Sequence, residues 1–430
     1  MKNFSVISLG CPKNQVDSEV LIGLLENAGF EYDPYSDNFD FVVVNTCGFI
    51  QDAVDESFST FRRLIELKRQ GKIRKIVVTG CLIQRFRRNI KKFFPDIDLI
   101  LGIDQEPELA EILKKKAGIK RILTSRWIYT GREPRVLLSS NYAYIKVSEG
   151  CNRRCAFCII PKMRGRYRSR KIEEIVDEAY SLAHLGIKEV ILVAQDLTLY
   201  GYDIYGKPSL DRLVRELNKI PGIEWIRLLY LYPSSINKKL LDAIAESDKV
   251  AKYLHVPIQH ASDKILRLMR RAGGRKGVEK ALSLIRKNLP DFYIRTEVIV
   301  GFPEEDESDF RELISFINDY RPERIAIFPY SDENEAASHR LPNKVPDEII
   351  NDRITELSLT VQDIMIEVQE NFVGKEIKVL LDADTEGRTE YDAPEIDFIV
   401  KFKKAKNGPI VRSRILKVDE TGDLLAEQIN

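Results

Sequence analysis

The chain has 430 residues, of which 44% are hydrophobic and 31% are charged, and its formal net charge is +1. This composition is typical of a soluble globular protein, and the length predicts two to four domains. A net charge this close to zero excludes a global field that steers the chain toward nucleic acid or membrane. The chain has no apolar run of about 18 residues and no amino-terminal signal core, so we expect a cytoplasmic protein.

The first 125 residues alternate short apolar strands with helices. Such alternation predicts an open, mostly parallel α/β sheet that is covered by helices. The expected strands are 4–9, 41–45, 75–79, 99–102 and 121–125, and the expected helices are 17–29, 52–70 and 85–93.

Three cysteines follow strands of this sheet directly. Cys11, Cys47 and Cys81 end the phrases V-I-S-L-G-C, V-V-V-N-T-C and I-V-V-T-G-C. Sites in open α/β sheets form outside the carboxyl ends of the strands. We therefore expect the three cysteines to converge, although three buried cysteines acting as small hydrophobic side chains are an alternative.

Residues 126–141 lack periodicity and are expected to form a linker, after which strands and helices alternate again over residues 142–365. The expected strands are 143–148, 189–193, 225–230, 253–257, 293–300 and 324–328. Because a closed barrel has eight βα units, six of them predict a partial, open barrel. A long helix over about 346–371 follows. Short strands expected at 376–382, 397–402 and 410–418, within residues 366–430, predict a small all-β, OB-like module.

The other three cysteines form one tight run, C-N-R-R-C-A-F-C, with Cys151, Cys155 and Cys158. Three thiolates can hold three irons of a four-iron cluster and leave the fourth iron open for chemistry. A zinc site is the alternative, but it usually has four ligands and no fourth cysteine lies nearby. A cytoplasmic setting disfavours a disulfide. The two triplets therefore predict two four-iron clusters.

The tight run, placed after the first strand of a partial barrel, resembles the radical S-adenosylmethionine superfamily. The resemblance implies that the open iron chelates S-adenosylmethionine and that the reduced cluster cleaves it to a 5′-deoxyadenosyl radical. It also implies that the backbone of Phe157 lies near the adenine, and that the loops 194–196, 255–260 and 298–305 line the cavity. Gly301 is expected to allow a close approach of backbone to cofactor. The usual phrase there is G-F-P-G-E-T, whereas this chain has G-F-P-E-E-D.

The phrases L-G-C-P-K-N-Q-V-D-S-E, V-N-T-C-G-F and V-T-G-C resemble the amino-terminal domain of the methylthiotransferase family. The resemblance covers essentially the whole chain and implies that Cys11, Cys47 and Cys81 hold a second cluster, which carries the sulfur for insertion. It further implies an external reductant such as flavodoxin or ferredoxin. The basic run at residues 161–170 is either a solvated loop or a contact for substrate or phosphate.

The family has two branches, one acting on a tRNA adenosine and one on an aspartate of small-subunit ribosomal protein number twelve. Residues 366–430 resemble a TRAM module and carry fourteen acidic against ten basic residues, a net charge of −4. An acidic surface repels phosphate and suits a basic ribosomal protein. The phrases at 193–201 and 387–397 also resemble the ribosomal-protein branch. We therefore expect that branch, with a tRNA-modifying enzyme and a non-catalytic iron–sulfur scaffold as the alternatives.

Overall fold

The computed structural model describes residues 2–115, 118, 122–123, 125–404 and 408–429. By their contacts the residues fall into two compact units. The first unit is Met1–Leu138, Lys146–Arg170 and Ser331–Ala336, and the second is Ser139–Ile145, Lys171–Tyr330 and Ala337–Asn430. None of the described helices is long and apolar enough to cross a membrane.

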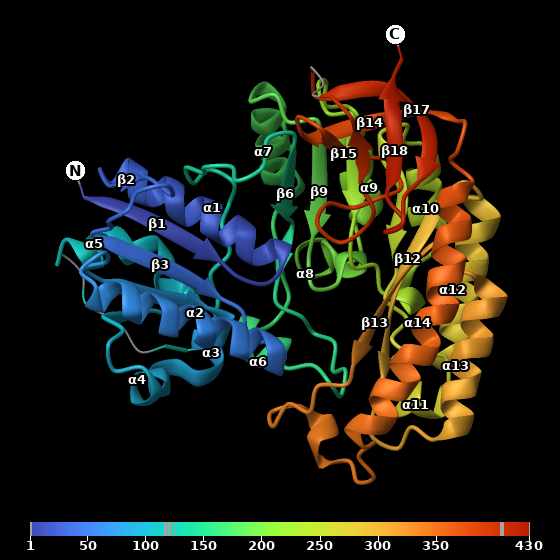
Figure 1. The fold of residues 1–430 in the computed structure, drawn as a ribbon, viewed down its shortest axis with the longest axis horizontal. Helices are drawn as coiled ribbons and strands as arrows, with labels where there is room; N and C mark the ends of the chain where they lie inside the picture. Colours follow the sequence, from blue (N-terminus) through green and yellow to red (C-terminus); the bar gives the residue numbers. More distant parts are fainter. Residues whose placement is uncertain (1, 116–117, 119–121, 124, 405–407, 430) are drawn as a thin grey trace. The chain divides into compact units, whose positions relative to one another are not determined.

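The first unit contains a five-stranded parallel sheet with the strand order β2-β1-β3-β4-β5, of which β1, β2 and β3 are labelled in Figure 1. Its strands are β1 Asn3–Ser8, β2 Glu31–Tyr32, β3 Phe41–Thr46, β4 Ile76–Gly80 and β5 Leu99–Ile100. Val42 and Val44 of β3 face one hydrophobic core, whereas Phe41 and Val43 face the other. Both faces of the sheet are therefore buried, which explains its continuous apolar strands.

Helices of the first unit flank this sheet. One predicted helix is interrupted in the structure. The helices are α1 Pro12–Asn27, α2 Gln51–Arg69, α3 Cys81–Phe86, α4 Ile90–Phe93, α5 Leu109–Leu113 and α6 Ile160–Arg164. A single helix was expected over 85–93, but Arg87 takes a φ of 54° and ends α3, and a 3₁₀ turn leads into α4. The strand expected at 121–125 lies partly outside the described residues, and Ile122, Leu123 and Ser125 belong to no strand.

The second unit is built around an open six-stranded sheet with the order β13-β12-β11-β10-β9-β6, in which β9 to β13 pair in parallel. The strands are β6 Tyr142–Lys146, β9 Glu189–Val193, β10 Trp225–Leu228, β11 Val250–His255, β12 Tyr293–Val300 and β13 Arg324–Pro329. The sheet does not close on itself, which confirms the predicted partial barrel of six βα units. The two short strands β7 Ser148–Glu149 and β8 Arg168–Ser169 belong to the first unit.

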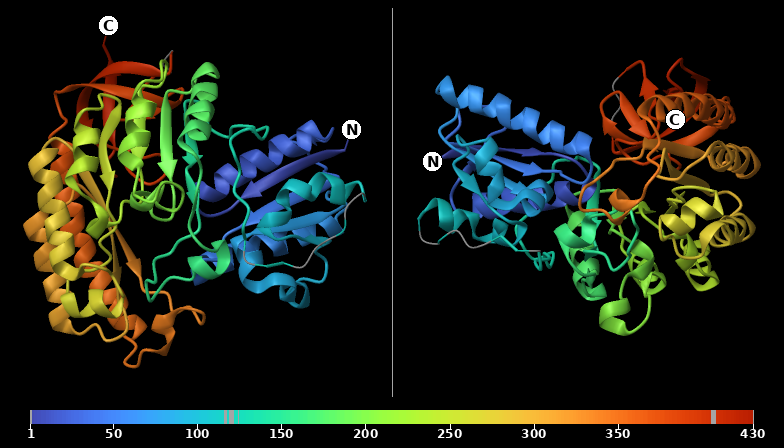
Figure 2. Two further views of the ribbon diagram at one scale, coloured as in Figure 1. Left: turned by 180° about the vertical axis from the view of Figure 1, so that it is seen from behind. Right: turned by 90° about the horizontal axis from the view of Figure 1, so that it is seen from below.

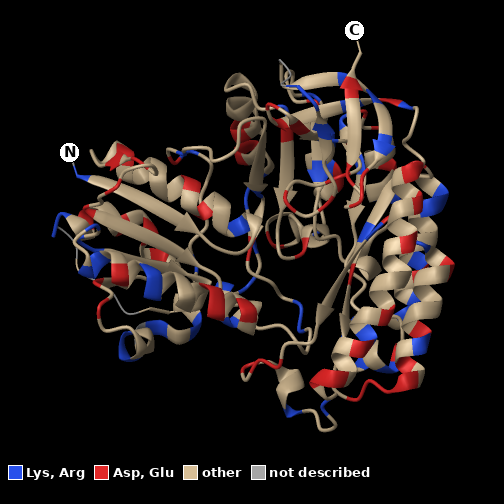
Figure 3. Ribbon diagram, viewed as in Figure 1, with Lys and Arg blue, Asp and Glu red and all other residues tan. Residues whose placement is uncertain are grey.

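Helices cover the outer side of the six-stranded sheet, as the green, yellow and orange ribbons of Figure 2 show. They are α7 Ile172–His184, α8 Tyr202–Tyr205, α9 Leu210–Asn218, α10 Lys238–Ala245, α11 Asp263–Leu268, α12 Gly274–Asn288, α13 Glu307–Tyr320 and α14 Asp347–Glu370. Acidic and basic residues are interspersed along α12, α13 and α14 (Figure 3), as on an ordinary solvated helix face. The last of these helices is the long one that the sequence predicted.

The chain ends in a small closed barrel with the order β14-β15-β16-β18-β17. Its strands are β14 Glu376–Ala383, β15 Glu386–Arg388, β16 Val400–Phe402, β17 Ile410–Val418 and β18 Leu424–Gln428. The predicted all-β module is confirmed. The sequence did not predict β15 and β18, because E-G-R and L-L-A-E-Q are short and lack a clear alternation of apolar and polar residues.

Buried ion pairs join this small barrel to the six-stranded sheet. Arg324, the first residue of β13, donates from Nε and Nη2 to Oδ1 of Asp392 at 2.8 and 2.7 Å. Arg295 of β12 donates to Asp397 at 3.2 Å, and the Tyr253 hydroxyl donates to the same carboxylate at 2.7 Å. These side chains are almost fully buried. A buried charge is tolerated only when it is paired, so the two barrels depend on one another.

This interface reduces the acidic surface that the net charge predicted for the carboxy-terminal module. Residues 381–400 hold seven acidic residues. Asp392 and Asp397 are inside the molecule, paired with arginines of the six-stranded sheet. Asp382 pairs with the buried Arg388. The exposed acidic residues of this stretch are Asp384, Glu386 and Glu395. The charge count predicted a surface because it could not show which acids have buried partners.

Candidate metal centres

The structure brings the three dispersed cysteines to one edge of the first sheet. Cys11 is the N-cap of α1 after β1, Cys47 follows β3, and Cys81 is the first residue of α3 directly after β4. Because β1, β3 and β4 are neighbouring parallel strands, their carboxyl ends lie side by side. Gly10 has a φ of 90°, and a Cβ there would lie 2.8 Å from the Cys47 sulfur, so the Cys47 side chain packs against the backbone that precedes Cys11.

The thiols of this triplet are close enough to influence one another. Burial, and then the charge of Cys11, raise the pKa of Cys47 to about 11. Burial raises the pKa of Cys81 to about 12, and the nearby Arg164 guanidinium opposes this rise. In the metal-free protein these two side chains are therefore neutral thiols at neutral pH. Metal binding would have to displace their protons.

The second triplet lies on one compact loop between β7 and α6. The Cys151 N–H donates to the Gly165 carbonyl at 3.1 Å, so the two ends of the loop are held together. Within the loop, the Cys158 N–H donates to the Cys155 carbonyl at 3.2 Å, and the Arg153 N–H donates to the Cys151 sulfur at 3.3 Å. Cys151 is buried, whereas Cys155 and Cys158 are partly exposed.

The donor chemistry of both triplets fits a four-iron cluster. All six cysteines lie in the described part of the chain, and none of them is in a disulfide. Nowhere in that part do three or more His, Cys, Asp or Glu side chains converge on a position for one metal ion. Each cysteine of a four-iron cluster binds a different iron, so the cluster sets the spacing of the thiolates. The role of the six cysteines as cluster ligands remains a prediction.

The basic run at 161–170 is not a fully solvated loop. Arg164 is 1% exposed and donates from Nε to the Cys81 sulfur at 3.1 Å. Arg170 is 2% exposed and donates to the Lys146 carbonyl at 3.1 Å. The contact of Arg164 with Cys81, a cysteine of the dispersed triplet, was not predicted from the sequence. Nothing in the basic run distinguishes Arg164 from its basic neighbours, because its burial at the end of a helix of five residues is visible only in the structure.

Two further buried polar residues, which contact Arg164, were not predicted from the sequence. Asn14 and Asp17 both lie buried on α1, three residues apart and therefore on one face of the helix. The Asn14 amide donates to the carbonyls of Leu9 and Thr46 at 2.8 and 3.0 Å. It thus links the segment just before Cys11 to the segment just before Cys47. Their presence in the phrase C-P-K-N-Q-V-D was visible in the sequence, but their burial was not.

The buried Glu106 is expected to make stability depend on pH. Burial, and then the charge of Asp17, raise its pKa from the usual 4.5 to about 8, and its Oε1 accepts from the Thr79 hydroxyl at 2.8 Å. The folded protein thus holds a proton on Glu106 at neutral pH. This contribution to stability is complete below pH 4.5 and is lost as the pH rises through about 8.

The variant Glu106→Gln mimics the protonated form and should remove that dependence. We expect the variant to gain stability over the parent protein as the pH rises from about 5 to 8, by about 1.4 kcal/mol for each unit of pKa shift. Urea unfolding at several pH values measures the difference. A variant that loses stability in parallel with the parent over this range would contradict the assignment.

The two residues expected to bind cofactor, Phe157 and Gly301, lie in different parts of the fold. Phe157 is half-buried in the cysteine loop. Gly301 follows β12 with a φ of 81°, and a Cβ there would lie 2.4 Å from the Ile350 side chain of α14. Its N–H already donates to Glu305 at 2.9 Å. The close packing of α14 thus accounts for this glycine, and contact of either residue with cofactor stays a prediction.

Strained backbone gathers where the strands of the second unit end. Tyr230, Gln259 and Glu304 have φ values of 63°, 76° and 73° and follow β10, β11 and β12. Non-glycine residues in this region cost about 1–3 kcal/mol each and tend to cluster at functional sites. The buried His255 ring lies 4.9 Å from Tyr230, and its Nε2 lies 3.0 Å from Glu297. This end of the sheet is the active-site end in barrel folds.

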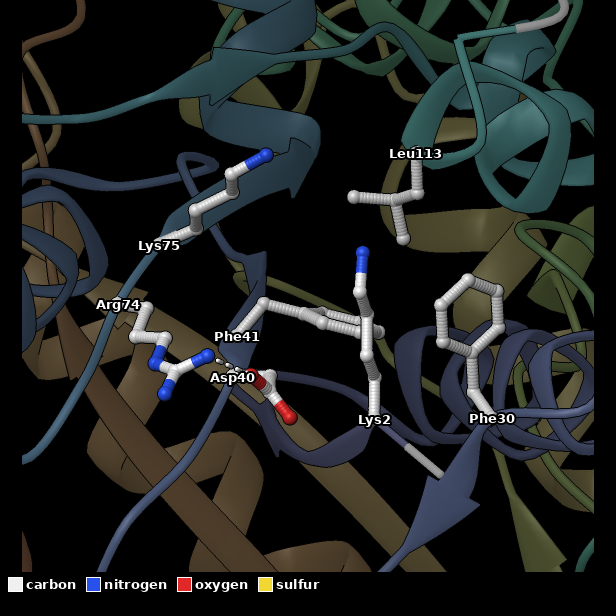
Figure 4. A pocket seen from close by; sticks show the side chains of 7 residues that line it. All are labelled: Lys2, Phe30, Asp40, Phe41, Arg74, Lys75 and Leu113. Atoms are coloured by element: carbon white, nitrogen blue, oxygen red, sulfur yellow. Dashed lines mark hydrogen bonds and ion pairs between the residues drawn. The ribbon is translucent and has the colours of Figure 1, made fainter.

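A pocket of about 150 Å³ lies at the opposite edge of the first sheet, away from the cysteines (Figure 4). It is bordered by Lys2, Phe41 and Lys75, which stand at the amino ends of β1, β3 and β4. Arg74 beside it pairs with Asp40 at 3.0 Å. The pocket lies at the amino ends of the strands, whereas Cys11, Cys47 and Cys81 follow their carboxyl ends, so it is not part of the candidate metal centre.

Three family models match separate parts of the chain. Residues 3–102 match the uncharacterized protein family UPF0004, residues 145–317 match the radical SAM superfamily, and residues 373–429 match the TRAM domain. Among solved structures, the radical S-adenosylmethionine methyltransferase TsrM from Kitasatospora setae aligns with a TM-score of 0.56 at 17% identity, over 76% of this chain and 74% of that one. The cobalamin-dependent radical enzyme OxsB aligns with a TM-score of 0.56 at 12% identity, over 84% and 56%. These likenesses concern the fold.

The open parallel sheet, the cysteine loop and the matched superfamily together define a radical S-adenosylmethionine enzyme. The chain is 40% identical to the ribosomal protein uS12 methylthiotransferase RimO of Clostridioides difficile, over 99% of this chain and 100% of that one. It is 42% identical to the protein of the same name from Aquifex aeolicus, over 96% and 94% of the two chains. The chain therefore belongs to the RimO family of methylthiotransferases.

Proposed function

We propose that this enzyme inserts sulfur and a methyl group at the β-carbon of an aspartate in ribosomal protein uS12. The observation that carries the proposal is the full-length identity of about 40% to relatives named for that activity. The two cysteine triplets support it, since they supply one site for generating a radical and a second site for carrying sulfur. An unactivated C–H bond offers no acidic proton at neutral pH, so its functionalisation calls for a radical route.

Each triplet would hold one four-iron cluster. Cys151, Cys155 and Cys158 would hold the first, which when bound supplies the electron for cleavage of S-adenosylmethionine, and a second S-adenosylmethionine supplies the methyl group. Cys11, Cys47 and Cys81 would hold the second, on which the sulfur resides. Residues of the second unit at the strand ends, among them His255 and Glu297, would orient cofactor and substrate and exclude water.

The carboxy-terminal module would contact the ribosomal protein, with an external one-electron donor such as flavodoxin or ferredoxin as the second partner. The exposed acids Asp384 and Glu386 at the β14–β15 turn support contact with a basic partner. This surface is smaller than the net charge of −4 suggested, because part of that charge is paired inside the molecule. We expect the reaction to take place in the cytoplasm, where ribosomes are assembled.

Mass spectrometry on two candidate substrates tests the function. The reconstituted, dithionite-reduced enzyme is incubated with S-adenosylmethionine and either uS12 or unmodified tRNA. We expect one methylthio group on a single aspartate of uS12 and none on tRNA. Modification of tRNA alone would establish the other branch of the family. Reduced protein that forms no 5′-deoxyadenosine with either substrate would instead be a scaffold rather than an enzyme.

A further inference from the structure

Four buried charges in the first unit form a closed ring, called here the charge ring: Asp17, Lys146, Glu149 and Arg164. Lys146 Nζ bonds to Asp17 and lies 2.9 Å from Glu149 Oε2. Arg164 Nη1 closes the ring with contacts of 3.1 Å to Glu149 and 2.8 Å to Asp17. Each carboxylate thus bridges both cations, and the ring has no net charge. All four residues are at most 1% exposed.

The charge ring connects segments that are far apart in the sequence. Asp17 lies on α1, the helix that begins at Cys11. Lys146 and Glu149 precede the loop of Cys151–Cys158, and Arg164 ends the short helix that follows it. Both ends of the loop are therefore fixed to the helix that starts at the first cysteine of the other triplet. The helices α3, which begins at Cys81, and α6 are in direct contact.

Arg164 also extends from the ring to the dispersed triplet. Its Nε donates to the Cys81 sulfur at 3.1 Å, and its Nη2 donates to the Asn14 side-chain oxygen at 2.5 Å. The guanidinium thus contacts the ring, the helix α1 and one cysteine at once. A planar guanidinium can make these three directed contacts, whereas the ammonium of a lysine cannot match their fork geometry.

Buried ion pairs are costly to desolvate, and hydrophobic side chains of similar volume often stabilise a folded protein as much or more. Stability alone therefore does not explain why four charges are buried here. A ring that spans both cysteine sites has a use that hydrophobic packing lacks, because directed ion pairs fix one relative placement of the segments they join. Transfer of an atom between two sites requires such placement, and an error of about 1 Å can cost about 10²-fold in rate.

We propose that the charge ring positions the two cysteine triplets for sulfur transfer, with Arg164 as a positioning residue that donates an N–H to the Cys81 sulfur. The inference rests on the proposed function, because it takes Cys81 as a cluster ligand. Hydrogen bonds to the sulfurs are among the factors that set the reduction potential of an iron–sulfur cluster. A charged donor stabilises the reduced, more negative cluster, and its loss lowers the potential.

The first experiment measures that potential without any substrate. In the full chain with Cys151, Cys155 and Cys158 replaced by Ala, only the dispersed triplet is left to bind a cluster, and an EPR-monitored redox titration reports its potential. We expect Arg164→Gln to shift the potential to a more negative value. Glu19→Gln is the matched control, since Glu19 is equally buried on α1 and paired, but with Arg135 and not with a residue of the charge ring.

Each outcome of this titration decides something about Arg164. An assembled cluster with an unshifted potential in Arg164→Gln overturns the proposal. If Arg164→Gln and Arg164→Lys both lose iron from this site while Glu19→Gln retains it, the positioning role is supported through cluster binding instead. Loss of iron in Glu19→Gln as well would show a general loss of folding and overturn the specific role.

The second experiment measures coupling between the two sites in the enzyme with all six cysteines. Asp17→Asn breaks two sides of the charge ring and leaves every cysteine in place. We expect the yield of methylthiolated product per 5′-deoxyadenosine to fall by up to about 10²-fold, while Glu19→Gln keeps the parental ratio. An unchanged ratio in Asp17→Asn overturns the proposal. If uS12 is not a substrate, only this second experiment fails, because the titration needs no substrate.

Discussion

Replacing Cys11, Cys47 and Cys81 together by Ala is expected to abolish sulfur insertion completely while cleavage of S-adenosylmethionine continues. The three cysteines follow the carboxyl ends of β1, β3 and β4. In the sequence they are far from the loop that carries the other triplet. Without their thiolates the proposed cluster could not form at this edge, and the second site would lose its proposed sulfur carrier. The intact loop of Cys151–Cys158 still has every ligand that it needs.

Quantifying 5′-deoxyadenosine by chromatography and methylthiolated uS12 by mass spectrometry separates the two activities. Replacement of Cys151, Cys155 and Cys158 by Ala is the reciprocal variant, and it should lose both products. Iron analysis should find about half of the parental iron in either variant, as expected for two clusters with three cysteines each. Sulfur insertion by the first variant would contradict the two-site scheme.

Replacing Arg324 by Ala is expected to destabilise the second unit by about 3–5 kcal/mol, the usual cost of removing one partner of a buried ion pair. Arg324 is fully buried, and Asp392 would lose both hydrogen bonds that its Oδ1 accepts from Arg324, keeping only the one that its Oδ2 accepts from Thr389 among those described. Gln369 at the end of α14 would lose its contact with Nη2 of Arg324 as well. The loss is larger than that expected for most single substitutions.

Urea unfolding monitored by circular dichroism measures this loss. Arg311→Ala is the matched control, because Arg311 pairs with Glu356 across α13 and α14 on the solvent side and is 53% exposed. Exposed pairs add little to stability, so the control should unfold together with the parent protein. If Arg324→Ala also unfolded at the parental urea concentration, the ion pairs would not hold the two barrels together.

The overall architecture could be predicted because it depends on local patterns. The strands at 189–193 and 293–300 were predicted with the bounds that the structure shows, since continuous apolar or β-branched runs between helices mark buried parallel strands. The positions of Cys11, Cys47 and Cys81 at one edge follow from the same pattern, because each stands directly after a strand of a parallel sheet. These inferences use only near neighbours in the chain.

The buried ion pairs could not be predicted, because their partners are distant in the sequence. Arg164 and Asp17 are 147 residues apart, and Arg324 and Asp392 are 68 residues apart. A charged residue in a strand or a short loop looks the same in the sequence whether it faces water or a buried partner. For this reason the acids near residue 392 were taken for a surface, and Arg164 for part of a basic loop.

The docking of the carboxy-terminal barrel has a consequence for synthesis of the chain on the ribosome. Arg295 and Arg324 belong to strands made well before Asp392 and Asp397, so the strands emerge without the carboxylates that pair with them. Domains generally fold as units while the chain is made from its amino terminus. The six-stranded sheet cannot complete its buried ion pairs until Asp392 and Asp397 have also left the ribosome. Emergence of these two carboxylates is thus the step that allows the catalytic domain to reach its final stability.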